Sequence, residues 1–478
     1  MKDIIIIGAG VVGSLLARKL SSYNLDVLVL DKENDVGNVT SMANSAIVHS
    51  GYDPKPGSLK AKLNVEGNRL FPNLCKELDV SFSQIGSLTV AIFDEQLPVL
   101  EELANRSKEN GVEVELLSKE EVLKMEPNLT SEVKGALLAP SAGIVNPFTL
   151  VVHAMENAVD NGVKLCLGEE VTSIKDNGDF FSVITKKNTY EAKIVIDAAG
   201  VYSDKIHSMI EKIDYEVKPR KGEYYVLDHY GKMLVNHTIF PLPSEKGKGI
   251  LVSPTTSGNF IVGPSSEWVD DKEDLSTDKP TLVNVKAQAQ MMVPNIPFNE
   301  VIRTFSGLRP TPSTHDFILG TAKSNNRFIL ASGIESPGLA SSPAIANYLV
   351  DNFVSKVIKL TPKKDFNPYV RKRYVPSKMT SKERNELIKA HPEYGKIICN
   401  CEKVSLGEIL DEFSRSVPPH TIKAVKKRTR AGFGKCQGGF CQPLVLALIA
   451  SNYKMKKTDV LLDKDGSYIA HYLTKEAK

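Results

Sequence analysis

Four of the six cysteines lie in two close pairs toward the end of the chain, Cys399-Asn400-Cys401 and Cys436-Gln437-Gly438-Gly439-Phe440-Cys441. Four thiolates in two pairs can hold either a zinc ion or an iron–sulfur cluster. Structural zinc sites more often have two to four residues between the cysteines of each pair, and a C-x-C pair is tight around one tetrahedral ion. Gly438 and Gly439 would let backbone N–H groups approach the sulfides of a cluster. The pattern favours an iron–sulfur cluster, with zinc, free thiols or disulfides as the alternatives.

A glycine pattern at the start of the chain could bind a dinucleotide. Gly8-x-Gly10-x-x-Gly13 follows the apolar run Ile4–Ile7 and opens a segment with helical spacing of apolar residues. The glycines allow a tight turn and the close approach of a pyrophosphate to the helix N-terminus, where free N–H groups and the helix dipole favour an anion. Asp31 ends the next apolar run and is placed to accept a hydrogen bond from a ribose hydroxyl. We therefore predict a dinucleotide site.

Two later segments favour FAD over NAD, a choice that the glycine pattern alone leaves open. The segment from Ile194 to Gly200 is predicted to be a buried strand running into small residues, which would let the backbone lie against a bound cofactor. Gly333 to Leu339 precedes a helix that we expect to start near Pro343, and its N-terminus could face the electron-rich end of a reduced flavin. A plain strand-to-helix turn is the alternative for each segment. Only one dinucleotide fingerprint is visible, so a separate NAD site is not expected.

These motifs require a core of strands and helices to position them. The sequence predicts buried strands at Ile4–Ile7 and Val27–Leu30. We expect further strands at 87–93, 181–185, 194–196, 224–227 and 260–262, and helices at 150–161 and 343–357. Alternating elements of both kinds, with long excursions between them, predict an α/β fold that carries an inserted sheet domain.

Composition limits the classes of function. Lysine and arginine total 60 against 57 aspartate and glutamate, and the net charge of +3 gives no reason to expect nucleic acid as a partner. The sequence has no run of about 18 apolar residues and no export signal at its N-terminus, so we expect a cytoplasmic protein without a transmembrane segment.

A basic stretch punctuated by prolines at 361–395 is predicted to be a linker with one helix near Ser381–Ala390. Residues 456–478 are predicted to form a C-terminal tail.

Several segments together resemble the D-amino-acid-oxidase-type flavoproteins. They are the glycine fingerprint, Asn44 to Gly51, Lys55 to Leu63, Ala198-Ala199-Gly200 and Gly333 to Leu339. Within that superfamily the chain most resembles FAD-dependent glycerol-3-phosphate dehydrogenases, and L-2-hydroxyglutarate oxidases are a close second. The resemblance covers residues 1–360. It implies a Rossmann-like FAD-binding domain with an inserted antiparallel-sheet substrate lobe at about 85–145 and 215–315.

The resemblance also implies an activity, the transfer of a hydride from a small hydroxylated anion to FAD. His49 and His237 lie in segments that resemble the family's active-site regions, and either would act as the base. Arg309, in Phe305-Ser306-Gly307-Leu308-Arg309-Pro310, matches the position of an anion-binding arginine. The leading substrate is sn-glycerol 3-phosphate, which would be oxidised to dihydroxyacetone phosphate.

The cofactor contacts that the resemblance implies are spread along the chain: Gly8, Gly10, Gly13, Asp31, Lys32, Ser45, Val171, Ala199, Gly200, Gly307, Gly333, Ser336, Pro337, Gly338 and Leu339. Lys55, Lys60, Lys62 and Lys221 could add positive charge near the substrate. Exposed lysines that keep the chain soluble are the simpler interpretation for at least two of the first three. The chain departs from the single-module glycerol-3-phosphate dehydrogenases at 41–50, which contains no arginine to bind a phosphate. L-2-hydroxyglutarate, or another 2-hydroxy or amino acid, is therefore the alternative substrate.

Residues 396–455 resemble the bacterioferritin-associated-ferredoxin-like [2Fe-2S] module, a small helical domain in which the four cysteines would hold the cluster. The cluster would pass electrons singly to a protein or quinone acceptor, and docking at a membrane surface through such a partner is conceivable. The basic run from Lys423 to Lys435 is expected to be a solvated face, to offset the charge of the cluster, or to dock an acidic partner. Two other classes stay open: an electron-transfer subunit without its own substrate, and an iron-handling module.

Overall fold

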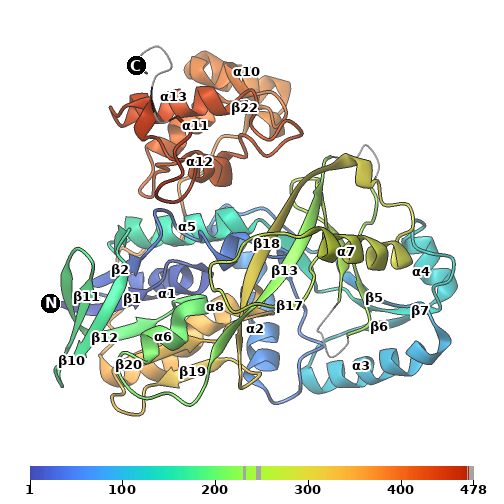
Figure 1. Ribbon diagram of the computed structural model, residues 1–478, viewed down its shortest axis with the longest axis horizontal. Coiled ribbons are helices and arrows are strands. Elements are labelled where there is room, and N and C mark those ends of the chain that lie inside the picture. Colours follow the sequence, from blue (N-terminus) through green and yellow to red (C-terminus); the bar gives the residue numbers. More distant parts are fainter. Residues whose placement is uncertain (230–232, 244–248, 471, 473–478) are drawn as a thin grey trace.

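The computed structural model describes residues 1–229, 233–243, 249–470 and 472. Two large sheets and a small C-terminal module, residues 397–452, make up the molecule (Figure 1). The N-terminus lies beside the eight-stranded sheet, the nine-stranded sheet lies next to it, and the C-terminal module lies over helix α5 (Pro147–Asp160). Within the described ranges, no helix is long and apolar enough to cross a membrane.

The first strand lies inside the eight-stranded sheet because its isoleucines are buried on both faces. β1 (Lys2–Ile7) pairs in parallel with β2 (Val27–Asp31) and β12 (Thr189–Asp197). Ile4 and Ile6 pack into one core and Ile5 and Ile7 into another, as a strand covered on both faces requires. The other strands are β9 (Lys164–Leu167), β10 (Val171–Asp176), β11 (Phe181–Thr185), β19 (Ile318–Thr321) and β20 (Phe328–Ser332). Their order is β10-β11-β12-β1-β2-β9, with β20 also beside β12 and β19 beside β20.

Helices from distant parts of the sequence cover this sheet. α1 packs against α5 and α8, and α2 packs against α8. We call the eight-stranded sheet with these helices the FAD lobe. The helices of the first 360 residues are α1 (Val11–Ser21), α2 (Leu59–Glu77), α3 (Leu97–Asn110), α4 (Lys119–Met125), α5, α6 (Ser203–His207), α7 (Lys279–Met292), α8 (Gly338–Leu349) and α9 (Ser355–Val357).

The nine-stranded sheet is built from two separate stretches of chain. The first supplies β5 (Ser87–Ala91), β6 (Glu115–Ser118) and β7 (Gly135–Ala139). The second supplies β13 (Val217–Leu227), β14 (Thr238–Pro241), β15 (Leu251–Pro254), β16 (Phe260–Gly263), β17 (Glu267–Trp268) and β18 (Val301–Pro312). All pairings are antiparallel except that of β14 with β5, which joins the two stretches. A separate three-stranded sheet consists of β3 (Ile47–Val48), β8 (Gly143–Val145) and β4 (Phe82–Ser83), and Ile47 packs against Phe240 and Leu251 of the nine-stranded sheet.

The predicted linker runs along the FAD lobe before the chain enters the C-terminal module. Asn157 of α5 and Asn161, the C-cap residue of this helix, both donate side-chain hydrogen bonds to the Asn367 carbonyl (2.9 and 2.8 Å). α10 (Ser381–Ala390) follows, capped by Thr380. The module contains β21 (Ile397–Cys399), β22 (Val404–Ser405), α11 (Leu406–Phe413), α12 (Ile422–Thr429) and α13 (Gln442–Asn452).

A buried ion-pair cluster attaches the C-terminal module to the FAD lobe. Asp35, in the loop after β2, accepts two hydrogen bonds from the Arg428 guanidinium (2.9 and 2.8 Å). The Lys427 ammonium lies 2.6 Å from the same carboxylate. All three side chains are almost completely buried. The bidentate geometry and the second cation together compensate for the loss of solvent around Asp35.

The predicted fold class is confirmed, and the predicted helices and strands are present, several of them with shifted ends. β11 and α10 occupy their predicted ranges, and α5 begins three residues before its predicted start. The helix expected from Pro343 begins at Gly338, and the Ser341 N–H already donates to the Pro337 carbonyl (3.0 Å). The prediction took Pro343 for a first-turn proline, whereas it lies inside α8.

Replacing Asp35 with asparagine should loosen the C-terminal module. The variant leaves Lys427 and Arg428 buried without a carboxylate, a change that typically costs about 3–5 kcal/mol. Burial raises the pKa of Asp35, but Arg428 and Lys427 outweigh this effect and hold the pKa well below its usual value. The contribution of Asp35 to stability is therefore fully present above about pH 4 and is lost as the pH falls further. Thermal unfolding and limited proteolysis of the linker at neutral pH measure the effect.

The matched control is Asp79→Asn, which removes a pairing of the linker residue Arg373 with a carboxylate that is 43% exposed (3.9 Å). Exposed pairs contribute less than about 1 kcal/mol, so this variant should unfold and be cleaved like the unaltered protein. Equal losses in the two variants would show that Asp35 does not hold the module.

Candidate functional site

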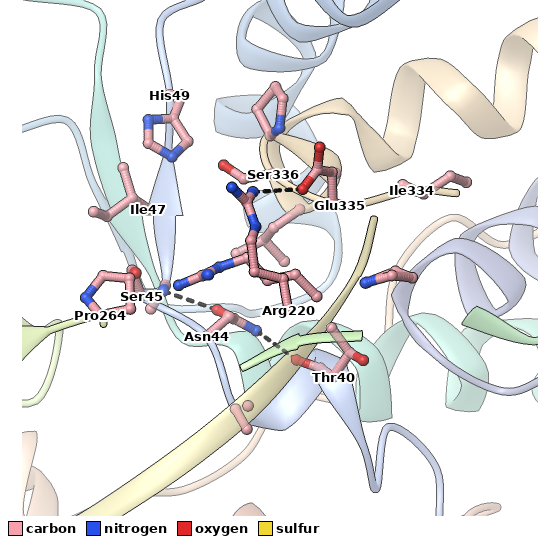
Figure 2. Close-up of a pocket in the computed structure, with 18 of the residues that line it drawn as sticks. Thr40, Asn44, Ser45, Ile47, His49, Arg220, Pro264, Ile334, Glu335 and Ser336 are labelled. Atoms are coloured by element: carbon pink, nitrogen blue, oxygen red, sulfur yellow. Dashed lines mark hydrogen bonds and ion pairs between the residues drawn. The ribbon is translucent and has the colours of Figure 1, made fainter. Parts of the chain in front are cut away.

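A cavity of about 460 Å³ lies where the two large sheets meet. Its wall is formed by the N-terminus of α1, the segment 40–49, strands β13 and β18, and the turn 334–339. Figure 2 shows His49 and Ser45 on one side, while Arg220 extends toward Glu335 on the other. Segments far apart in the sequence thus enclose one space, whose size is typical of a small-molecule site.

The glycine turn packs so closely that only glycine fits at two of its positions. Gly8 has a φ of +107°, and a Cβ there would lie 2.4 Å from the carbonyl oxygen of Ala198. A Cβ on Gly13 would lie 1.9 Å from the carbonyl oxygen of Gly8. The turn thereby brings the start of α1 to the cavity, where Gly10 and Val11 line the wall. This is the geometry in which a helix N-terminus binds a pyrophosphate.

The acid predicted to bind a ribose lies at the end of β2, next to the glycine turn. The Asp31 carboxylate accepts hydrogen bonds from the backbone N–H groups of Ala9 (2.6 Å) and Glu33 (2.8 Å). Lys32 extends over the ring of Tyr202 (4.1 Å). The two backbone N–H groups hold the Asp31 carboxylate in one orientation beside the turn, as ribose recognition requires.

The residues predicted to contact the flavin divide between the cavity wall and the packing behind it. The wall includes Ser45, Gly200, Gly307, Ser336, Pro337, Gly338 and Leu339. The others lie outside the lining: Gly8, Gly13, Asp31 and Lys32 at or near the glycine turn, Val171 at the buried start of β10, Ala199 and Gly333. A Cβ on Gly200 would meet nothing within 4 Å, so this backbone is open to a cofactor. Because α8 begins at Gly338 on the wall, a second helix N-terminus faces the same space, and the residues present fit FAD.

Three cations reach the cavity from three different elements. Arg309 on β18 donates a hydrogen bond to the Ser265 carbonyl (3.0 Å). Arg220 on β13 and Lys60 on α2 both donate to the buried carboxylate of Glu335 (2.6 and 2.8 Å). Burial raises the pKa of Glu335, but Lys60 and Arg220 outweigh this effect and hold the pKa below its usual value. The lining also includes the carboxylates of Asp53 and Glu267, so its charges balance overall, whereas the three cations grouped around Glu335 provide a local positive charge that suits a small anion.

Arg220 and Glu335 are missing from the residues predicted from the sequence. The alternation of side chains along β13 could have identified Arg220, because Arg220 and Tyr224 share a face of the strand and both line the cavity. Lys221, which was considered instead, lies on the opposite face and pairs with Asp274 (2.8 Å). No sequence signal marks Glu335, since a glutamate between glycines is ordinary in a turn.

Among the three lysines of the segment 55–62, only Lys60 lines the cavity. Lys55 is exposed and lies outside the lining. Lys62 is exposed too, and its ammonium lies over the ring of Tyr348 (5.6 Å). Lys60 and Lys62 point differently because they lie two residues apart on the helix α2, and such residues do not share a face.

The two candidate histidines lie in different places. His49 lines the cavity, and its ring centroid lies 5.8 Å from that of Phe240. His237, just before β14, lies outside the lining, and its Nδ1 is 2.7 Å from the Glu126 carboxylate. A catalytic base must reach the proton that it removes, so the structure leaves His49 as the candidate of the two.

The four clustered cysteines lie as two pairs in the C-terminal module. The sulfurs of Cys401 and Cys436 are 3.7 Å apart, and Cys399 and Cys441 are both buried. The neighbouring Cys441 thiol, with backbone N–H groups including that of Gly432, lowers the pKa of Cys399 against the effect of burial. Among the described residues, no three His, Cys, Asp or Glu side chains are grouped closely enough to hold a metal ion. The chemistry of the donors fits a cluster with two irons.

Most of the basic run does not form a free solvated face. Lys427 and Arg428 are buried against Asp35. The other paired members are Lys423 with Asp463, Arg430 with Glu402 (2.7 Å) and Lys435 with Glu300 (3.1 Å). Lys427 and Arg428 therefore connect the C-terminal module with the loop after β2, and Lys435 with the turn before β18. The pairs of Lys423 and Arg430 lie within the C-terminal part of the chain.

Two family models match the chain. A model described as FAD dependent oxidoreductase matches residues 3–352, and one described as BFD-like [2Fe-2S] binding domain matches residues 397–451. The first contains the glycine turn and the cavity, and the second contains all four clustered cysteines. FAD and a [2Fe-2S] cluster are therefore the cofactors of this chain.

Relatives of known activity match the chain over different lengths. Glycerol 3-phosphate dehydrogenase of Caloramator mitchellensis is 45% identical over 98% of both chains. Glycerol 3-phosphate oxidase of Mycoplasma pneumoniae is 34% identical over 73% of this chain and 94% of its own. Mitochondrial L-2-hydroxyglutarate dehydrogenase of Arabidopsis thaliana is 28% identical over 74% of this chain and 83% of its own.

The fold agrees with these relationships. The structure of dithionite-reduced L-alpha-glycerophosphate oxidase from Mycoplasma pneumoniae with FAD bound has a TM-score of 0.75 and 33% identity, covering 78% of this chain and 99% of that one. Glycine oxidase from Geobacillus kaustophilus, at 23% identity and a TM-score of 0.68, shares the fold. The chain therefore belongs to the FAD-dependent oxidoreductase family and carries a BFD-like [2Fe-2S] binding domain at its C-terminal end.

Proposed function

We propose that this oxidoreductase converts sn-glycerol 3-phosphate to dihydroxyacetone phosphate and passes the electrons through its cluster to an acceptor outside the chain. The observation that carries the proposal is the first cavity. His49 lies there together with Arg309, Arg220 and Lys60, next to the glycine turn. Relatives named glycerol 3-phosphate dehydrogenase and oxidase support this substrate over L-2-hydroxyglutarate, whose dehydrogenases are less similar.

The residues of the cavity have distinct roles in this reaction. FAD, when bound, supplies the acceptor for the hydride. His49 takes the proton of the substrate hydroxyl, because an imidazole titrates near neutral pH. Arg309 and Arg220 bind the phosphate through their planar donor groups. Glu335 holds Arg220 and Lys60 in place, so that these cations stay at the wall before the substrate enters.

The phosphate-binding cations come from α2, β13 and β18 in this chain. The segment 41–50 lacks an arginine, but it supplies Ser45 and His49 to the same cavity. The three cations opposite it compensate, since a phosphate monoester carries about two negative charges at neutral pH. The missing arginine therefore does not argue against a phosphorylated substrate.

The C-terminal module distinguishes the chain from the oxidase relatives. The dehydrogenase relative and this chain match over 98% of both lengths. The Mycoplasma pneumoniae oxidase matches over 94% of its own length but only 73% of this chain. An oxidase passes its electrons to oxygen. We infer that the cluster replaces this step with single-electron transfer to a protein or quinone, which could lie at a membrane surface.

His49→Gln should slow the reduction of the flavin. Removing a general base typically lowers the rate of proton-coupled chemistry by about 10²–10⁴-fold. The measurement is the bleaching of the flavin after anaerobic mixing with glycerol 3-phosphate. His237→Gln is the matched control and should bleach at the unaltered rate, since His237 lies outside the cavity. Absence of bleaching in the unaltered protein would rule out this substrate.

Arg309→Gln should raise the KM for glycerol 3-phosphate by about tenfold or more. A hydrogen bond between charged groups contributes about 1.5–3 kcal/mol, and the variant removes at least one such bond to the phosphate. Lys62→Gln, which removes an exposed cation outside the cavity, should leave the KM unchanged. Steady-state assays with an artificial electron acceptor measure both values. An unchanged KM in Arg309→Gln would remove this arginine from the phosphate site.

Cys436→Ser should abolish the iron–sulfur absorption bands but leave FAD bound. The cysteine and the flavin cavity lie in different parts of the chain, so anaerobic bleaching by substrate should persist while electron transfer to the physiological acceptor is lost. Absorption spectra and analysis of iron and sulfide test this expectation. Zinc without iron in the unaltered protein would contradict the cluster.

A further inference from the structure

A second cavity, of about 580 Å³, separates the C-terminal module from the two large sheets. One wall carries Gly438 and Cys441 of the cysteine segment. The opposite wall carries Ala43, Asn44 and Ala46, which also line the first cavity. The second cavity therefore lies between the cysteines and the flavin-binding segment, and its volume is within the range of small-molecule sites.

The second cavity is strongly positive. Its charged lining consists of Arg303, Lys423, Lys426, Lys427, Arg430 and Asp463. Among the described residues, Lys423, Lys427 and Arg430 each have a carboxylate partner, whereas no ion pair is formed by Arg303 or Lys426. These two side chains instead both donate to the Gln437 side-chain oxygen, each at 3.4 Å. Two cations that share one neutral acceptor leave donors available to an anion.

Lys426 reflects this excess of positive charge. Its ammonium shares the lining with Arg303, Lys423 and Arg430, and donates there to the neutral side-chain oxygen of Gln437. A bound anion would relieve the repulsion and add the missing carboxylate-like partner. The cations of this cavity thus outnumber its carboxylates, as expected of a binding site for an anion. A completed ion-pair network would have a carboxylate for each cation.

Aromatic rings lie in the same cavity. Phe433 and Phe148 have their ring centroids 5.4 Å apart, and the Lys426 ammonium lies 4.6 Å from the centroid of Phe433. Phe305 also lines the cavity and stacks on Tyr224 of the first cavity at 4.6 Å and 5°. Aromatic rings can stack on a planar ring, and unpaired cations can bind a phosphate attached to it.

We propose that the second cavity binds an aromatic mononucleotide, with its phosphate on Arg303 and Lys426 and its ring among Phe148, Phe305 and Phe433. FMN and AMP both present this chemistry, a phosphomonoester attached to a planar ring. They differ in that only the ring of FMN accepts electrons. This inference does not depend on the proposed substrate, because it concerns a separate cavity and is tested by binding alone.

Isothermal titration of the holoenzyme, saturated with FAD and loaded with its cluster, tests the proposal. We expect FMN or AMP to bind saturably. Riboflavin and adenosine, which lack the phosphate, should bind at least about tenfold more weakly, because a loss of about 1.4 kcal/mol of binding free energy lowers the affinity tenfold. Tighter binding of FMN would identify a redox-active ligand, and tighter binding of AMP an adenine nucleotide. No saturable binding of either at about 1 mM would overturn the proposal.

Variants locate the site. Lys426→Gln should weaken binding at least about tenfold, whereas Lys435→Gln, which removes an exposed cation of the same basic run outside the lining, should not. Phe433→Leu keeps an apolar side chain but removes the ring, and should weaken binding at least about fivefold. Equal effects of Lys426→Gln and Lys435→Gln would overturn the proposal. If Lys426→Gln alters only the spectrum of the cluster and no nucleotide binds, the cations serve the cluster and the proposal is wrong.

Discussion

The buried carboxylate of Glu335 is the group on which the arrangement of the site depends. It lies in the turn before α8 and accepts hydrogen bonds from Lys60 on α2, Arg220 on β13 and Thr311 on β18. A buried anion is stable only when it is paired, so these contacts tie the FAD lobe to the nine-stranded sheet at the cavity. They also fix two of the three cations at the wall. One carboxylate therefore links elements of the two sheets and holds two of the cations that a substrate meets.

Asp35 has a comparable role for the C-terminal module. Its two buried cations belong to α12, and the loop that carries it follows the strand β2, which ends at Asp31 beside the glycine turn. The module is thus attached close to the expected path of the dinucleotide. The segment 43–46 separates the flavin cavity from the second cavity, which the cysteine segment lines. Substrate oxidation and electron transfer can therefore be served by neighbouring parts of one molecule.

Features carried by local sequence were predictable. The apolar run Ile4–Ile7 and the glycine turn after it follow from sterics within a few residues, because a Cβ at Gly13 would clash with a carbonyl only five residues away. The four cysteines were recognisable from their spacing, and the helix predicted at 381–390 is α10, which Thr380 caps. The start of α8 was predicted near Pro343 but lies at Gly338. A proline is common in the first turn of a helix, but Pro343 lies further along α8.

The composition of the site depended on long-range contacts. The sequence by itself determined that the chain has a glycine turn of the dinucleotide-binding type, four clustered cysteines and an α/β core, because short spacings and periodicity encode these features. Only the tertiary structure decided that His49 and not His237 lies at the cavity, and that Lys60, Arg220 and Glu335 meet there. The physical reason is that these choices depend on how strands and helices far apart in the sequence pack, and the pairing of buried charges between those elements has no local signature.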